Sequence, residues 1–99
     1  MSDEESVLSR LGPVTWSWDD GIAYEVALEG INQVVGAYSG LIGRAEASEN
    51  PDHAAIDAWV AAQNAWEDRR EALSPADRAG VDRVRAECAS LLAELRAQP

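Results

Sequence analysis

The chain has 99 residues, an apolar fraction of 46% and a formal net charge of −10 at pH 7. This length predicts one domain with one core, and the apolar fraction excludes a wholly disordered chain. The negative charge disfavours nucleic acids and anionic membranes as ligands, because their phosphate groups require cations. It favours either docking on a basic partner protein or solubility alone.

All eight cationic residues are arginine, a usage that suggests a bacterial protein from a GC-rich genome. The first residues lack the apolar segment of a signal peptide, and no stretch reaches the ~18 apolar residues of a membrane span. Cys88 is the only cysteine, which excludes an intrachain disulfide. The sequence therefore predicts a cytoplasmic protein.

Residues 1–18 are predicted to form an N-terminal arm, with a short helix followed by an extended segment. The helix begins with a Ser-x-x-Glu capping box at Ser2 and ends at Gly12 and Pro13. In the extended segment apolar residues alternate with polar ones, at Val14, Trp16 and Trp18. We expect these side chains to pack across the bundle. The alternative is an exposed tryptophan hook, since tryptophan is enriched at interface hot spots.

Residues 19–99 are predicted to form an all-α, up-down-up three-helix bundle. Its first helix starts either at Ser17 with Asp20 or at the Asp19-Asp20 pair, and runs for about 29 residues, or ~43 Å. An apolar seam with alternating spacings of four and three predicts its buried face. The seam consists of Tyr24, Leu28, Ile31, Val35, Tyr38, Ile42 and Ala45, with Ala27, Val34 and Leu41 widening it on one side.

The stretch from Gly30 to Gly43 carries no charge and holds four of the seven glycines. At 100° per residue, the face opposite the seam collects Glu25, Glu29, Asn32, Gly36, Gly40, Gly43 and Ala47. Another helix or a flat ligand could approach such a small-residue track closely. The alternatives are a helix that breaks near Ser39 and Gly40, or glycines that are merely tolerated.

The second helix is predicted to start at Asn50-Pro51-Asp52 with Asn50 as its cap. Its inner face comprises Ala55, Ile56, Trp59, Ala62, Gln63, Trp66 and Leu73. Gln63 would be a buried polar group in need of a hydrogen-bond partner.

The third helix is predicted to start at Ser74-Pro75-Ala76-Asp77 with Ser74 as its cap. Its inner face comprises Val81, Val84, Cys88, Leu91, Leu92 and Leu95. Because almost no loop precedes it, we expect the second and third helices to be antiparallel neighbours. They are about 23 and 24 residues long, so that part of the first helix projects beyond them. On its outer side we expect two i,i+4 ion pairs, Arg78 with Asp82 and Arg83 with Glu87.

Antiparallel packing would bring five carboxylates to one end of the bundle: Glu25, Glu29, Glu67, Asp68 and Glu71. Clustered carboxylates could bind a divalent cation or perform acid–base catalysis. No phosphate-binding loop, metal-ligand cysteine cluster or nucleophile elbow is present. We therefore expect no catalytic residue, no metal and no cofactor.

The favoured function is a small, non-catalytic protein-binding module, in its most concrete form an antitoxin or immunity-type inhibitor of a basic protein. The alternatives are a small dimeric helical enzyme or metal-binding subunit that uses the carboxylate cluster, and a structural subunit that associates only with itself. The residues predicted to bind a partner are Trp16, Trp18, Glu25, Glu29, Asn32, Gly36, Gly40 and Gly43.

Overall fold

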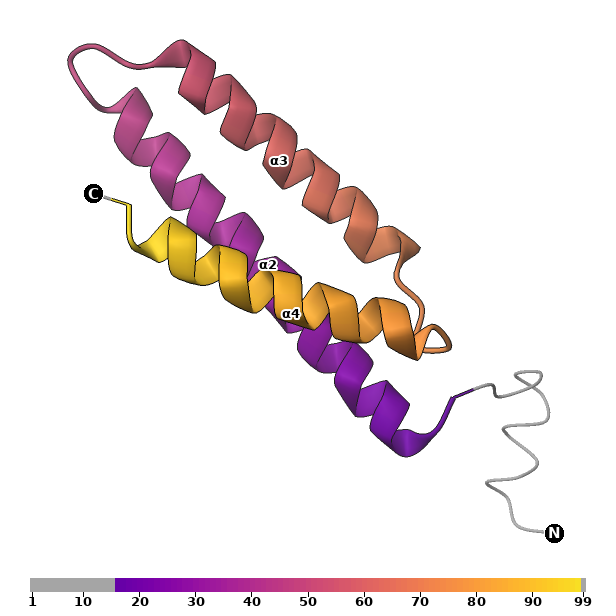
Figure 1. Ribbon diagram of the computed structural model, residues 1–99. Coiled ribbons are helices and arrows are strands. Elements are labelled where there is room, and N and C mark those ends of the chain that lie inside the picture. The colour runs from indigo at the N-terminus through magenta and orange to yellow at the C-terminus, as the bar shows by residue number, and fades with distance from the viewer. Residues whose placement is uncertain (1–15, 99) are drawn as a thin grey trace, which may run out of the picture.

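The computed structural model describes residues 16–98 and confirms an all-α three-helix bundle. The helices are α2 (Trp18–Glu46), α3 (His53–Ala72) and α4 (Arg78–Arg96). Figure 1 shows α3 running back alongside α2, while α4 crosses α2 at an angle. The predictions that fall on residues 1–15, including the short helix and the packing of Val14, lie outside the described residues.

α2 is a single helix of 29 residues, as the sequence predicts. It is continuous through Ser39 and Gly40, so the break considered there does not occur. Ser17 is its N-cap and forms a capping box with Asp20. Trp18 is therefore the first helical residue and is not part of an extended arm.

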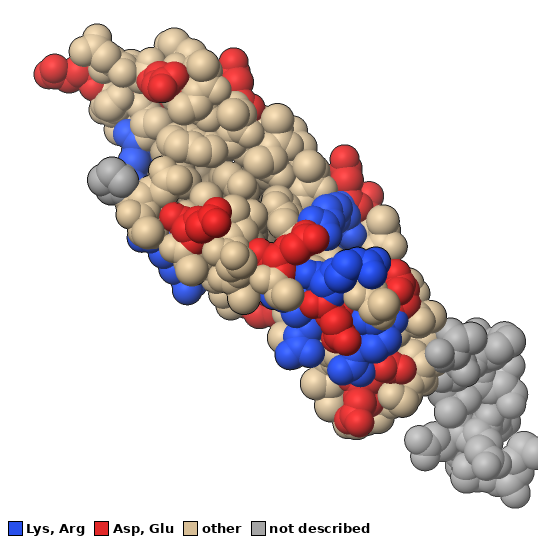
Figure 2. All heavy atoms as spheres, in the orientation of Figure 1, with Lys and Arg blue, Asp and Glu red and all other residues tan. Residues whose placement is uncertain are grey.

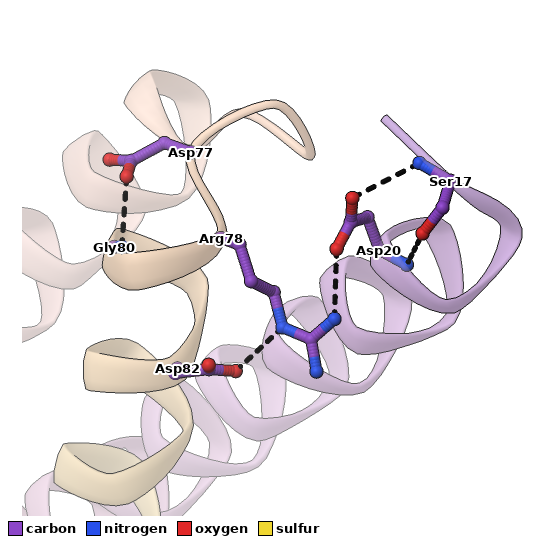
Figure 3. Close-up of polar contacts among 6 residues, drawn as sticks. All are labelled: Ser17, Asp20, Asp77, Arg78, Gly80 and Asp82. Atoms are coloured by element: carbon purple, nitrogen blue, oxygen red, sulfur yellow. Dashed lines mark hydrogen bonds and ion pairs between the residues drawn. The ribbon is translucent and has the colours of Figure 1, made fainter. Parts of the chain in front are cut away.

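α3 and α4 start later than predicted, because an aspartate caps each of them. The Asp52 carboxylate accepts a hydrogen bond from the Ala55 N–H. Figure 3 shows the corresponding hydrogen bond of α4, in which the Asp77 carboxylate accepts from the Gly80 N–H. Asn50 and Ser74, the predicted caps, lie in the preceding turns. The helices are consequently only 20 and 19 residues long, against 29 in α2.

Gly80 leaves room for the Asp77 carboxylate at the start of α4. A Cβ atom at Gly80 would collide with the Asp77 carboxylate that caps the helix. Gly80 is buried and donates its N–H to this carboxylate, so a side chain at this position would require the carboxylate to move.

The core lies where α2 packs against both other helices. Its buried members in α2 are Ala23, Ala27, Ile31, Val34, Tyr38 and Leu41, and those in α3 and α4 are Ile56, Trp66, Val81, Val84, Cys88, Leu92 and Leu95. Five of the seven predicted seam residues are only partly buried: Tyr24, Leu28, Val35, Ile42 and Ala45. The most deeply buried line of α2 includes Ala27, Val34 and Leu41. It faces the space between α3 and α4, because α2 packs against both of these helices.

α3 and α4 do not pack directly as the antiparallel neighbours that the short connection predicts. No Cα atom of α3 lies within 8 Å of a Cα atom of α4. The side chains of Trp66 and Arg69 reach from α3 to α4 instead. Trp66 lines a shallow groove with Ala86, Ser90 and Leu91. The Arg69 guanidinium lies 4.2 Å from the Trp66 ring centroid and pairs with Glu87 at 2.5 Å.

The predicted polar contacts are confirmed only in part. Arg78 pairs with Asp82 at 3.0 Å as predicted, whereas Glu87 pairs with Arg69 and not with Arg83. Gln63 has the partner that its position requires: its Nε2 donates to the Val35 carbonyl at 2.9 Å and to Ser39 Oγ at 2.6 Å. This contact fixes the middle of α3 on α2.

Candidate functional site: the exposed face of α2

One carboxylate fixes the first turn of α2. Asp20 Oδ2 accepts a hydrogen bond from the Ser17 N–H at 3.0 Å, and the Ser17 hydroxyl accepts one from the Asp20 N–H at 3.1 Å (Figure 3). Asp20 Oδ1 pairs with Arg78 at the start of α4, at 2.8 Å. The hydrogen bond from the Ser17 backbone, followed by that from Arg78, lowers the pKa of Asp20. The start of α2 is thereby tied to the start of α4.

From this fixed turn, large apolar side chains extend into solvent. Trp18 is 83% exposed, Ile22 is 49% exposed and Val26 is 47% exposed. Their spacing of four residues makes them a continuous row, which we call the apolar ridge. Trp16 is also exposed, and its indole ring lies near Gly21. The expected packing of Trp16 and Trp18 in the core is therefore wrong, and the exposed alternative is the observed arrangement.

The apolar ridge leads into an open groove between α2 and α4. This α2/α4 groove has a volume of about 590 Å³. It is lined by Val26, Glu29, Gly30, Gln33, Asp82, Arg85, Ala86, Cys88, Ala89 and Leu92. Its lining is mainly small or apolar, and the charged residues among its lining are Glu29, Asp82 and Arg85.

Gly30 allows the close approach of α4 at this groove. A Cβ atom built on Gly30 would lie 3.2 Å from the Cβ of Cys88, which is tighter than ordinary van der Waals contact. The sequence led us to expect close approach at Gly36, Gly40 and Gly43. The glycine that meets another helix is instead Gly30, at the N-terminal end of the uncharged stretch.

The three remaining predicted glycines lie on the open side of α2. A Cβ atom at Gly36 or Gly43 would meet nothing within 4 Å, and one at Gly40 would meet only Arg44, at 3.7 Å. They continue a row of exposed residues that runs the length of the helix, which we call the outer row. The outer row consists of Trp18, Ile22, Glu25, Glu29, Gly36, Gly40, Gly43 and Ala47, all exposed. Gly36 and Gly40 also line a second groove, whose other wall is formed by Leu92, Leu95 and Arg96 of α4. Among the described residues, no atom outside α2 lies within 4 Å of a Cβ position at any of the three glycines.

Of the predicted polar site residues, Glu25 and Glu29 belong to the outer row, whereas Asn32 faces α3. Glu29 accepts a hydrogen bond from Gln33 at 3.3 Å, within α2. The Asn32 side chain accepts one from Arg70 at 2.6 Å. Asn32 thus helps to hold α3 on α2.

The described residues do not assemble the predicted carboxylate cluster into a cation site. Among residues 16–98, no three histidine, cysteine, aspartate or glutamate side chains are grouped so that they could hold a metal ion. Figure 2 shows acidic and arginine side chains interspersed over the end of the molecule where α3 ends and α4 begins. The arginines there include Arg69, Arg70 and Arg78. The carboxylates at this end lie among guanidinium groups.

Cys88 is buried in the core, and burial raises the pKa of its thiol. A buried thiol with a raised pKa is a weak nucleophile, because the thiolate is the reactive form. Cys88 therefore acts as a small apolar residue at the α2–α4 crossing, as its position in the seam predicts.

Ile22 and Val26, as parts of the exposed surface, and Gly30, as the point of contact with α4, were not predicted from the sequence. A signal for the first two was present, because Trp18, Ile22 and Val26 repeat every four residues on the side of α2 away from the predicted seam. For Gly30 no local signal exists, since its role depends on where α4 crosses.

None of the helices in the described part of the chain is long and apolar enough to cross a membrane. Comparison of the sequence with protein families and with curated proteins, and of the chain with solved structures, gave no match.

Proposed function

We propose that this chain is a non-catalytic protein-binding module that binds a basic, amphipathic helix of another protein. The observation that carries the proposal is the apolar ridge, which leads into the α2/α4 groove. A tryptophan that is 83% exposed on an ordered helix is typical of a binding surface, since buried aromatic anchors dominate interface energetics. An amphipathic helix that places its apolar face in a groove is a common mode of peptide recognition.

The charge distribution supports a basic partner. The full chain carries a net charge of −10, which accelerates encounter with a positively charged surface. Glu29 and Asp82 line the α2/α4 groove, and Glu25 is exposed one residue before Val26. A helix whose apolar face contacts Val26 would therefore place its flanking cations near these carboxylates. An antitoxin or immunity-type inhibitor of a basic protein is the most concrete form of this function.

The proposal is tested with Val26→Arg, which places a cation at the mouth of the α2/α4 groove. The matched control is Val60→Arg, because Val60 is a similarly exposed valine, 38% against 47%, on α3. Proteins captured by the wild type from a lysate of the source cells are identified, purified and titrated against all three chains by calorimetry. We expect the captured partner to be basic and its affinity for the wild type to fall with added salt. Its affinity should be about 10-fold or more lower for Val26→Arg and unchanged for Val60→Arg. Equal affinity for all three chains, or capture of no protein, would contradict the proposal.

A further inference from the structure

We propose that a second copy of this chain docks on the outer row of α2, with the two α2 helices antiparallel. The two-fold axis of this dimer passes between Asn32 and Gln33. This inference goes beyond the proposed function, because it names a second and competing occupant for the same exposed face of α2.

The outer row is complementary to itself in size. In an antiparallel pair centred between Asn32 and Gln33, the N-terminal half of one helix faces the C-terminal half of the other. Every residue of the outer row then faces another member of the row, and each large residue faces a small one. The pairs are Trp18 with Ala47, Ile22 with Gly43, Glu25 with Gly40 and Glu29 with Gly36.

The space beside the small residues is empty on the side where the second helix would lie. Nothing lies within 4 Å of a Cβ position at Gly36 or Gly43. Backbones can approach closely where such residues line a helix, and larger side chains from the other helix then fill the space. Trp18 and Ile22, which are 83% and 49% exposed in the single chain, would be covered.

One pair of opposite charges would also meet between the two copies. The Arg44 side chain lies over Gly40, with its Nη1 3.7 Å from the Cβ position there. In the antiparallel pair Gly40 faces Glu25 of the second copy, so that Arg44 of one chain meets Glu25 of the other. Because the dimer is two-fold symmetric, this ion pair forms twice. Within one chain the two residues are about 28 Å apart along α2, so they can interact only between copies.

The dimer and the complex with a basic partner exclude each other. Trp18 and Ile22 belong both to the outer row and to the apolar ridge, and one helix that covers them leaves no room for a second. Self-association therefore keeps the apolar ridge covered until a partner competes for it.

The first test is the oligomeric state, measured by sedimentation equilibrium from micromolar to millimolar concentration. We expect a monomer–dimer equilibrium for the wild type and a dissociation constant at least about 100-fold higher for Gly40→Leu, which fills the space opposite Glu25. The matched control is Ala58→Leu, at an exposed position of α3, and it should dimerise like the wild type. Circular dichroism checks that both variants remain helical. A monomeric wild type, or a Gly40→Leu variant that dimerises normally, would overturn the proposal.

The second test is a charge exchange that reports the antiparallel register. Arg44→Glu and Glu25→Arg should each weaken the dimer about 10-fold, because two attractions become two repulsions. The chain that carries both changes should regain the wild-type dissociation constant. If the double variant is no tighter than the single ones, the two residues do not meet.

These tests separate this inference from the proposed function. Gly40 does not line the α2/α4 groove, so Gly40→Leu should bind the basic partner while it no longer dimerises. A monomeric wild type that still binds its basic partner through Val26 refutes the dimer alone. A dimer that captures no basic partner refutes the proposed function alone.

Discussion

Replacing Trp66 with alanine should remove most of the stability of this domain. Trp66 is 8% exposed and belongs to the core cluster. It also reaches towards α4 from a helix whose Cα atoms all lie more than 8 Å from those of α4. Truncation of a buried tryptophan to alanine costs about 3–5 kcal/mol, and the exposed cation–π contact with Arg69 adds about 0.5–1 kcal/mol. A domain of this size has about 5–15 kcal/mol in total.

The assay is unfolding by urea and by heat, each followed by far-ultraviolet circular dichroism, which reports helix content and does not depend on tryptophan emission. At about 4–8 °C per kcal/mol, the melting temperature should fall by at least about 12 °C. Trp18→Ala serves as the control at concentrations where the chain is monomeric, because this ring is then exposed and its removal should change the unfolding free energy by less than about 0.5 kcal/mol. Unfolding curves of Trp66→Ala and wild type that superpose would refute both the burial of Trp66 and the register of α3.

Two further predictions concern α2. Gly36→Ala, measured at concentrations where the chain is monomeric, should stabilise by about 0.4–1 kcal/mol. Gly30→Ala should lack this gain, because its Cβ would lie 3.2 Å from that of Cys88; equal gains at both sites would contradict the close α2–α4 crossing. The last prediction concerns the pKa of Asp20, which is lowered from its usual value of 3.8. The wild type should exceed Asp20→Asn in unfolding free energy by a constant amount above pH 3.8. This difference should shrink as the pH falls through the lowered pKa of the folded state. A difference in unfolding free energy that stays constant from neutral pH to about pH 2 would contradict the Asp20 contacts.

Periodicity predicted the three helices and most of their inner faces, because apolar spacing reports directly which side of a helix is buried. The start of α2 was also predictable, since Ser17 and Asp20 form a local capping box. The starts of α3 and α4 could not be predicted in the same way. Asn50-Pro51 and Ser74-Pro75 resemble helix starts, but Asp52 and Asp77 provide the carboxylates that accept the first free N–H groups.

The candidate site was less predictable than the fold. The sequence placed Gly36, Gly40 and Gly43 on a common face, and the structure leaves that face open. It could not show that Gly30 is the point of closest approach, because this depends on the angle at which α4 crosses α2. Nor could it decide whether Trp18 is buried or exposed, since an apolar residue at a helix start is compatible with either.

The contacts of Asp20 determine how the proposed binding surface is presented. By joining Ser17 at the cap of α2 to Arg78 at the start of α4, this carboxylate orders the turn that carries Trp18. Fixing one residue of backbone costs about 1–2 kcal/mol of conformational entropy, and here folding fixes this turn before any partner arrives. The apolar ridge is therefore preorganised, so association need not order its backbone, and more of the interaction energy remains as affinity.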